Sequence, residues 1–288
     1  MSSIAKEISA DTLANQAIME RRQSSRTILL VEGGTDARYF RRFVERDSVS
    51  LTICHDRERV ILTIGVLRAR GETGILGIVD SDFSFFRAQD QADDDDDIIK
   101  TDENDLETTI LPAVYEKILD EFGTEQKVNV AREKAQSPIQ RVFTEAAKIG
   151  ALRALSARDG LNLRFANMNF QFVSNASFEI DKLSTVEEVF RKSGVELDKD
   201  EVMEKLAAIV DGTEPIKLCS GHDCVRIFGR AIRREFGSDS RFDKSDRDKN
   251  DLYAILRVSH ETQDFQATTI YSEIRAWENR NPSWKVLS

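Results

Sequence analysis

The sequence predicts an α/β protein whose N-terminal part forms an open, mainly parallel β-sheet flanked by helices. Three short apolar runs without alternation, at residues 27–31, 51–54 and 75–79, are typical of strands buried on both faces of such a sheet. Segments with helical periodicity separate these runs, so strand and helix alternate over about sixty residues, as in a doubly wound sheet.

The two separating segments predict helices over Thr35–Arg46 and Arg57–Arg70, and a shorter helix is expected over residues 11–22. Thr35 is a residue type that caps a helix start. Each separating segment places its apolar residues on one helical face. In the first helix, that face is expected to consist of Ala37, Phe40, Phe43 and Val44.

Beyond residue 125 the pattern becomes mainly helical, so we expect residues 1–125 to form the α/β domain and residues 126–288 a helical region for substrate or partner contact. Just before this border, a short strand is expected at 98–99 and a helix over Leu106–Phe122. Later helices are expected over 132–155, 185–192, 199–210, 224–236, 251–258 and 261–277, with short strands at 169–173 and 177–180. The polar stretches 83–97 and 237–250 predict loops, and the first contains the acidic run Asp93–Asp97.

The net charge of −10 has the wrong sign for a protein held on nucleic acid by its bulk charge. No apolar run approaches the roughly 20 residues needed to cross a bilayer, and the first residues lack the apolar stretch of a secretory signal. We therefore expect a cytoplasmic protein without a membrane part. The three cysteines, Cys54, Cys219 and Cys224, do not form the paired spacing of a disulfide framework and are expected to be buried thiols.

Acidic residues stand directly after two of the predicted strands. Glu32 follows the first, and Asp80 and Asp82 follow the third. Because ligands gather at the carboxyl ends of parallel strands, neighbouring strands would bring these acids to one edge, and on an extended chain Asp80 and Asp82 point the same way. Carboxylates at such close quarters repel one another unless a cation neutralises them. Hard oxygen ligands suit one or two Mg²⁺ or Mn²⁺ ions, which can bind a phosphodiester and activate water.

Asp36 lies four residues after Glu32, in the first turn of the expected helix. Two readings stay open for it: a further metal ligand, or an acid that complements the positive end of the helix dipole. Gly33 and Gly34 would let the backbone beside Glu32 approach a ligand closely.

Together, Val31-Glu32-Gly33-Gly34-Thr35-Asp36 and Val79-Asp80-Ser81-Asp82 resemble the TOPRIM domain of topoisomerases, primases and OLD-family nucleases, over roughly residues 27–110. The resemblance implies a metal-dependent enzyme with Glu32, Asp80 and Asp82 as its central acids. Asp36 and the phrase Asp105-Leu106-Glu107 are similar to the OLD-like branch, which implies that Glu107 adds a metal ligand, whereas Asp105 could be a helix cap.

The whole chain, including Ser220-Gly221-His222-Asp223 ahead of a helix, is similar to the stand-alone TOPRIM effectors of the PARIS-type anti-phage system. This resemblance implies a homodimeric, toxic endonuclease that cleaves tRNA and is controlled by a partner ABC-type ATPase. The sequence contains no G-x-x-x-x-G-K-[ST] motif, which agrees with an ATPase on a separate chain.

Two groups of arginines could track a phosphate backbone, although a solvated face or an acidic partner would explain them equally simply. The groups are Arg38, Arg41, Arg42 and Arg46 on the first helix of the sheet, and Arg226, Arg230, Arg233 and Arg234 on a late helix. His222 stands at the start of that late helix, and Lys217 lies upstream on a stretch that could form a strand. Either could donate a proton or clamp charge at a phosphate, or serve only local capping and packing.

The predicted function is therefore a metal-dependent endonuclease, with RNA favoured over DNA. Two alternatives remain: a DNA nuclease of the OLD type, and a non-catalytic regulatory subunit of an ATPase complex. A dinucleotide site ranks below both, because Glu32-Gly33-Gly34-Thr35-Asp36 is not G-x-G-x-x-G and acids at both strand ends would repel a pyrophosphate.

Overall fold

The computed structural model describes residues 8–22, 25–86, 95–133, 137–166, 168, 178–196, 198–242 and 251–288. These residues form two compact units. The first unit contains the described residues within 1–81, 89–102 and 261–288, and the second those within 82–88 and 103–260. The predicted border near residue 125 falls inside the second unit, and the C-terminal segment returns to the first.

The first unit contains a four-stranded, all-parallel sheet in the order β2-β1-β3-β4. Its described strands are β1 (Thr27–Val31), β2 (Val49–Ile53), β3 (Ile75–Val79) and β4 (Ile98–Lys100). The chain winds from β1 outward to β2 and then crosses back to β3 on the other side of β1. This reversal makes the carboxyl ends of β1 and β3 the topological switch point, where open α/β sheets bind their ligands. The expected parallel α/β sheet is confirmed.

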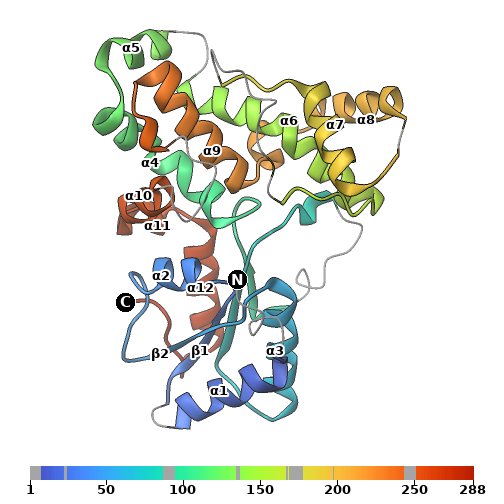
Figure 1. The fold of residues 1–288 in the computed structure, drawn as a ribbon. Coiled ribbons are helices and arrows are strands. Elements are labelled where there is room, and N and C mark those ends of the chain that lie inside the picture. Colours follow the sequence, from blue (N-terminus) through green and yellow to red (C-terminus); the bar gives the residue numbers. More distant parts are fainter. Residues whose placement is uncertain are drawn as a thin grey trace. The chain divides into compact units, whose positions relative to one another are not determined.

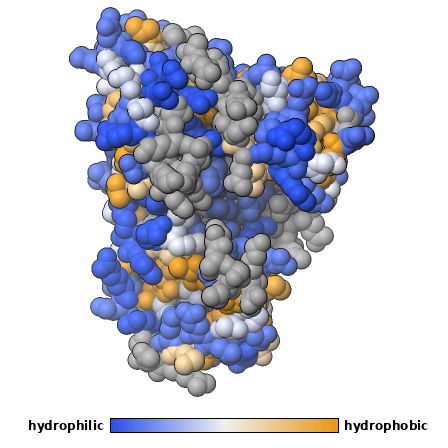
Figure 2. All heavy atoms as spheres, in the orientation of Figure 1, coloured by the Kyte–Doolittle hydropathy of each residue, from blue (hydrophilic) through white to orange (hydrophobic). Residues whose placement is uncertain are grey.

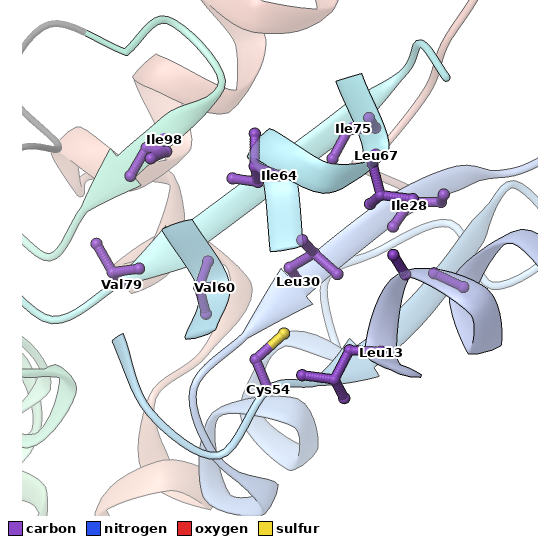
Figure 3. Packing of buried hydrophobic residues seen from close by; sticks show 12 residues of the cluster. Leu13, Ile28, Leu30, Cys54, Val60, Ile64, Leu67, Ile75, Val79 and Ile98 are labelled. Carbon is purple, nitrogen blue, oxygen red and sulfur yellow. The ribbon is translucent and has the colours of Figure 1, made fainter. Parts of the chain in front are cut away.

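One face of the sheet packs against α1 (Ala10–Arg22) and α3 (Arg57–Ala69). Figure 3 shows side chains from β1, β3 and β4 meeting the apolar side chains of these two helices. α3 lies close to β3 at Gly77, where an added Cβ would stand 2.8 Å from side-chain atoms of Val60 and Ile64. The uninterrupted apolar runs are thus explained by strands that are buried along their whole length.

The remaining helices of this unit are α2 (Gly34–Phe40), α11 (Thr262–Gln266) and α12 (Thr269–Arg280). α12 contacts β4, and Figure 1 shows α12 and α3 on opposite sides of the strands. The carboxylate of Asp102, just after β4, accepts hydrogen bonds from the first backbone amides of α12, from Thr269 N at 2.7 Å and Ile270 N at 3.1 Å. The last residues of the chain also belong to this unit, where Leu287 forms an antiparallel bridge with Val44.

Two predicted helices of the first unit have different bounds. The helix expected over Thr35–Arg46 ends at Phe40, and Gly33 rather than Thr35 is its N-cap. Phe43 and Val44 are buried as predicted, but beyond the helix: Phe43 lies in a turn and stacks on Phe265 with ring centroids 4.3 Å apart, and Val44 forms the bridge with Leu287. The helix expected over 261–277 is divided into α11 and α12, because the hydroxyl of Thr268 caps a new helix start.

The second unit is mainly helical, with the long helix α6 in contact with α5, α7, α8 and α9. Its α-helices are α4 (Leu106–Phe122), α5 (Glu125–Glu133), α6 (Pro138–Asp159), α7 (Lys182–Ser193), α8 (Lys199–Asp211), α9 (Gly221–Ala231) and α10 (Leu252–Ser259). Short 3₁₀ turns, η2 (Ser84–Phe86), η3 (Pro215–Leu218) and η5 (Ser240–Phe242), and a π-helical turn, η4 (Ile232–Phe236), complete it.

The helix predicted over 132–155 is two helices. α6 begins anew with Ser137 as its N-cap and Pro138 at its first position, a start signal that the apolar periodicity had masked. The strands predicted at 169–173 and 177–180 lie outside the described residues, apart from 178–180. Asp93 of the acidic run is also outside them, whereas Asp95 and Asp97 form ion pairs with Arg68.

The face of the molecule seen in Figure 2 is covered largely by hydrophilic residues, in keeping with a chain in which 32% of residues are charged. Across the described ranges, none of the helices combines the length and the apolar character required to cross a bilayer.

Candidate active site

The structure brings Glu32 and Asp80 together at the switch point of the sheet. Glu32 directly follows β1 and Asp80 directly follows β3, and these two strands are hydrogen-bonded neighbours. The backbone amide of Asp80 donates a hydrogen bond to Glu32 Oε1 at 2.7 Å. Both residues are partly buried. The prediction that separate strands deliver these two acids to one edge is confirmed.

The end of β3 is also held from its other side. The backbone amide of Ser81 donates to Thr101 Oγ1 at 3.0 Å, and the Ser81 hydroxyl donates to Thr101 O at 2.6 Å. Since Thr101 follows β4, the residues after β3 are fixed by both neighbouring strands. The position of Asp80 is therefore set by backbone contacts rather than by a mobile loop.

Asp82 differs from the expectation. The chain is not extended beyond β3: Asp82 has φ +48° and Phe83 has φ +59°, two successive residues in the left-handed region. Asp82 is exposed, and its amide donates to Asn104 O at 2.9 Å. Asp80 and Asp82 therefore do not lie on one extended strand, the condition under which they were predicted to point the same way. Asp82 belongs to the second unit, whereas Glu32 and Asp80 belong to the first.

Asp36 is engaged at the start of α2. Its Oδ2 accepts a hydrogen bond from Gly33 N at 2.7 Å, and its Oδ1 accepts one from Thr35 Oγ1 at 3.3 Å. This is the arrangement expected of an acid that complements a helix N-terminus. Of its two predicted roles, the structure shows the capping role, and metal binding by Asp36 stays a prediction.

A second acidic pair, Asp105 and Glu107, lies at the start of α4. Asp105 caps this helix, accepting hydrogen bonds from Thr108 N at 2.9 Å and Thr108 Oγ1 at 2.7 Å. Its other oxygen accepts from Gly221 N at 2.6 Å. Burial, followed by the negative charge of Glu107, raises the pKa of Asp105. Glu107 is 8% exposed and lies 3.9 Å from Arg257 Nη1.

Lys217 and His222 lie on either side of the turn that leads into α9. Lys217 is in the 3₁₀ turn η3 and not on a strand, and its ammonium group pairs with Glu103 Oε1 at 3.0 Å. His222 is an exposed residue of the first turn of α9, with Nδ1 3.1 Å from Tyr253 Oη. Both polar groups are thus accessible, but each already has a protein contact.

Asn104 joins these segments, and the sequence analysis did not single it out. Its Oδ1 accepts a hydrogen bond from Phe83 N at 2.9 Å, and its Nδ2 donates to Lys217 O at 2.7 Å and Cys219 O at 2.8 Å. Its side chain is buried, and these contacts use its acceptor and both of its donor hydrogens. A buried asparagine thus connects the Asp82 turn with the turn that carries Lys217 and His222.

The first arginine group is not carried by one helix as predicted, whereas the second lies on α9 and the π-helical turn that continues it. Arg38 is on α2, but Arg41 and Arg42 follow the end of this helix; all three are exposed. In the second group, Arg226 donates to Met168 O at 3.0 Å, and the helix changes from α to π before Arg233. The group of Arg226, Arg230 and Arg233 is only partly exposed. Their contact with nucleic acid stays a prediction.

Within the described ranges, no group of three or more His, Cys, Asp and Glu side chains is placed to hold a metal ion. The pair of Glu32 and Asp80 nevertheless has suitable chemistry. Mg²⁺ prefers oxygen ligands and keeps several waters, so one or two carboxylates plus a substrate phosphate commonly hold it in proteins. These residues therefore fit a hydrated divalent ion.

No family model matches this chain, and no curated protein matches it either. The functional reading therefore depends on the residues and their geometry.

Proposed function

We propose that this chain is a metal-dependent endonuclease with a TOPRIM-type site, in which Glu32 and Asp80 hold a Mg²⁺ or Mn²⁺ ion. The observation that carries the proposal is the contact between Glu32 and Asp80 at the carboxyl ends of two adjacent parallel strands. Two acids at a switch point are unfavourable neighbours for an anionic ligand unless a cation accompanies it. Such a bound ion would supply Lewis-acid stabilisation for phosphodiester hydrolysis.

The residues themselves would have separate tasks. Glu32 and Asp80 would orient the hydrated ion, and the amide contact between them would keep the Glu32 carboxylate in one rotamer. Asp82 and Glu107 are further carboxylates proposed for metal binding, with one or two ions in all. His222 and Lys217 are the proposed proton donor and charge clamp, because both side chains are exposed and an imidazole and an ammonium group are suited to these tasks at a phosphodiester.

For the substrate and partner, we propose tRNA or another RNA, with control of a toxic anti-phage activity by an ABC-type ATPase and assembly as a homodimer. These proposals derive from the likeness of the motifs Glu32-Gly33-Gly34-Thr35-Asp36 and Ser220-Gly221-His222-Asp223 to PARIS-type effectors. Expression of the wild-type chain and of Glu32→Gln in cells, followed by sequencing of RNA ends, tests them. New tRNA ends in the wild type alone support them, whereas ends shared by both chains contradict them.

The activity is tested on purified protein incubated with tRNA, other RNA, single-stranded DNA and duplex DNA, with Mg²⁺ or Mn²⁺. Glu32→Gln keeps the shape of the side chain and an oxygen that can accept from Asp80 N, but it removes the charge. We expect cleavage to fall by at least about 100-fold in this variant. Glu204→Gln, an exposed change on α8, is the matched control and should cleave like the wild type. Wild-type protein that leaves every substrate intact with metal would contradict the proposal.

A further inference from the structure

An exposed aromatic ring lies three residues beyond Asp82. The side chain of Phe85, in η2, is 81% exposed, more than any other large hydrophobic side chain in the described part of the chain. Single exposed apolar side chains are common on protein surfaces, so the exposure of this ring indicates a contact only together with the way in which its surroundings hold it. The question is which ligand its surroundings suit.

The backbone that presents Phe85 is fixed. Asp82 and Phe83 both adopt left-handed conformations, which non-glycine residues hold only where the surroundings stabilise them. Asn104 provides that stabilisation, because its backbone carbonyl accepts from Asp82 N and its side chain accepts from Phe83 N, each at 2.9 Å. Phe83 is turned inward with 9% exposure, while η2, which contacts α6, directs Phe85 outward.

Neighbouring rings hold the phenyl group in place. Phe86 packs edge-on against Phe85 with centroids 5.3 Å apart, and its centroid lies 6.4 Å from that of Phe83. The three rings form a short series from the buried Phe83 to the exposed Phe85. A ring supported in this way loses little freedom when a flat ligand covers its face, which favours binding.

Polar and basic groups accompany the ring. Asn104, which bonds Phe83, also bonds the carbonyl of Lys217, so the two segments meet at one side chain. The Lys217 side chain is 46% exposed, and His222 is exposed in the first turn of α9. An exposed ring whose segment is joined through Asn104 to the segment of Lys217 provides too little apolar area for a stable protein interface, which requires about 1,000 Å² or more. It does match a nucleotide, with a flat base and an anionic phosphate.

We propose that Phe85 stacks on an unpaired base of a single-stranded nucleic acid segment that the chain binds as its substrate. The inference depends on the proposed nuclease function and narrows its substrate class to unpaired regions, such as loops. A base inside a duplex has both faces covered by its neighbours, so it cannot present a face to the ring. Stacking on an aromatic side chain is tolerant of sequence, because every base has a π-face.

The test measures binding by fluorescence anisotropy, in a Glu32→Gln background to prevent cleavage. A labelled, unpaired RNA oligonucleotide is compared with the same strand in a duplex. Phe85→Ala should weaken binding to the unpaired strand by roughly 5- to 100-fold and leave duplex binding unchanged. Phe85→Trp should retain binding, and the fluorescence of the new indole should be quenched when the strand binds. Val258→Ala, which removes another exposed apolar side chain, should bind like its parent.

Several outcomes overturn the inference. Equal binding of the unpaired strand by Phe85→Ala and its parent excludes stacking, as does full binding by Phe85→Leu, which keeps apolar area without a π-face. A lower oligomeric mass of Phe85→Ala in light scattering would assign the ring to a contact between copies instead. In each of these cases, strand binding by the parent leaves the nuclease proposal intact. A parent protein that binds neither RNA nor DNA overturns both.

Discussion

The backbone amide of Gly221 donates a hydrogen bond to Asp105 Oδ2 at 2.6 Å. The first residue of α9 is thereby held against the residue that caps α4. The two segments are more than a hundred residues apart in the sequence, so this hydrogen bond is a long-range contact within the second unit.

Gly221→Ala should destabilise the protein. An added Cβ would overlap Asp105 Oδ1 and stand 2.6 Å from the Cβ of Glu107. We expect the free energy of unfolding to fall by about 1–3 kcal/mol. Gly65→Ala is the matched control, since this glycine lies in α3 with open space around it, and the change should stabilise by about 0.5–1 kcal/mol. Urea denaturation measures both; effects of the same sign would contradict the close approach at Gly221.

Asn104→Ala should also destabilise the second unit. The substitution removes three side-chain hydrogen bonds and leaves the buried partners Phe83 N, Lys217 O and Cys219 O without them. The expected loss is about 2–4 kcal/mol in the free energy of unfolding. Asn104→Asp should lower the free energy of unfolding at least as much as Asn104→Ala, because it places a carboxylate oxygen against two carbonyl oxygens. Asn15→Ala, at an exposed site, should change little; a mild effect at Asn104 would show that this side chain does not join the segments.

Stability should depend on pH through the pair of Arg68 and Asp95. Arg68 donates to both carboxylate oxygens of Asp95, at 2.8 and 2.5 Å, and these hydrogen bonds lower the pKa of Asp95. A lowered pKa in the folded state stabilises above the unfolded pKa of about 4, and the stabilisation is lost as the pH falls through the folded value. Arg68→Gln should thus lower the free energy of unfolding by up to about 1 kcal/mol at pH 7, since the pair is partly exposed. The loss should be smaller at pH 2–3.

The measurement is the free energy of unfolding of the wild type and of Arg68→Gln between pH 2 and 7, with Arg46→Gln as an exposed control. The difference between wild type and Arg68→Gln should shrink toward the acid end. A difference that stays constant or grows as the pH falls would show that the pair does not provide this stabilisation.

The three thiols should resist modification in the folded protein. Cys54, Cys219 and Cys224 are fully buried. Burial raises the pKa of Cys54 to about 12 and also raises the pKa of the other two, so little thiolate exists at pH 8. A thiol reagent such as DTNB should react with three groups in denaturant and only slowly without it. Rapid labelling of one cysteine in the native protein would contradict this burial.

The sheet could be predicted because its signals are local. β1 and β3 are uninterrupted apolar runs ended by Glu32 and Asp80. The adjacency of the two strands was a condition of the prediction, and the sheet order meets it. The ends of the helices were harder to predict from the sequence. Phe43 and Val44 satisfy the helical spacing but are buried by turns against the C-terminal segment, which the local pattern cannot indicate.

The rest of the candidate site depends on contacts that no local pattern specifies. No motif around Asn104 marks it in the sequence. It becomes a connecting residue only because folding brings Phe83, Lys217 and Cys219 to its side chain. The left-handed turn at Asp82 is equally unexpected, since no glycine, the residue that adopts positive φ most readily, marks it in the sequence. Tertiary contacts therefore decide how these segments of the second unit are built.

The central claim is that Glu32 and Asp80 hold a divalent metal ion, and anomalous diffraction from crystals soaked with Mn²⁺ tests it most directly. The account predicts an anomalous peak about 2 Å from carboxylate oxygens of both residues, and its loss in crystals of Glu32→Gln. Soaked wild-type crystals that bind Mn²⁺ elsewhere, with no peak between these two side chains, would contradict it.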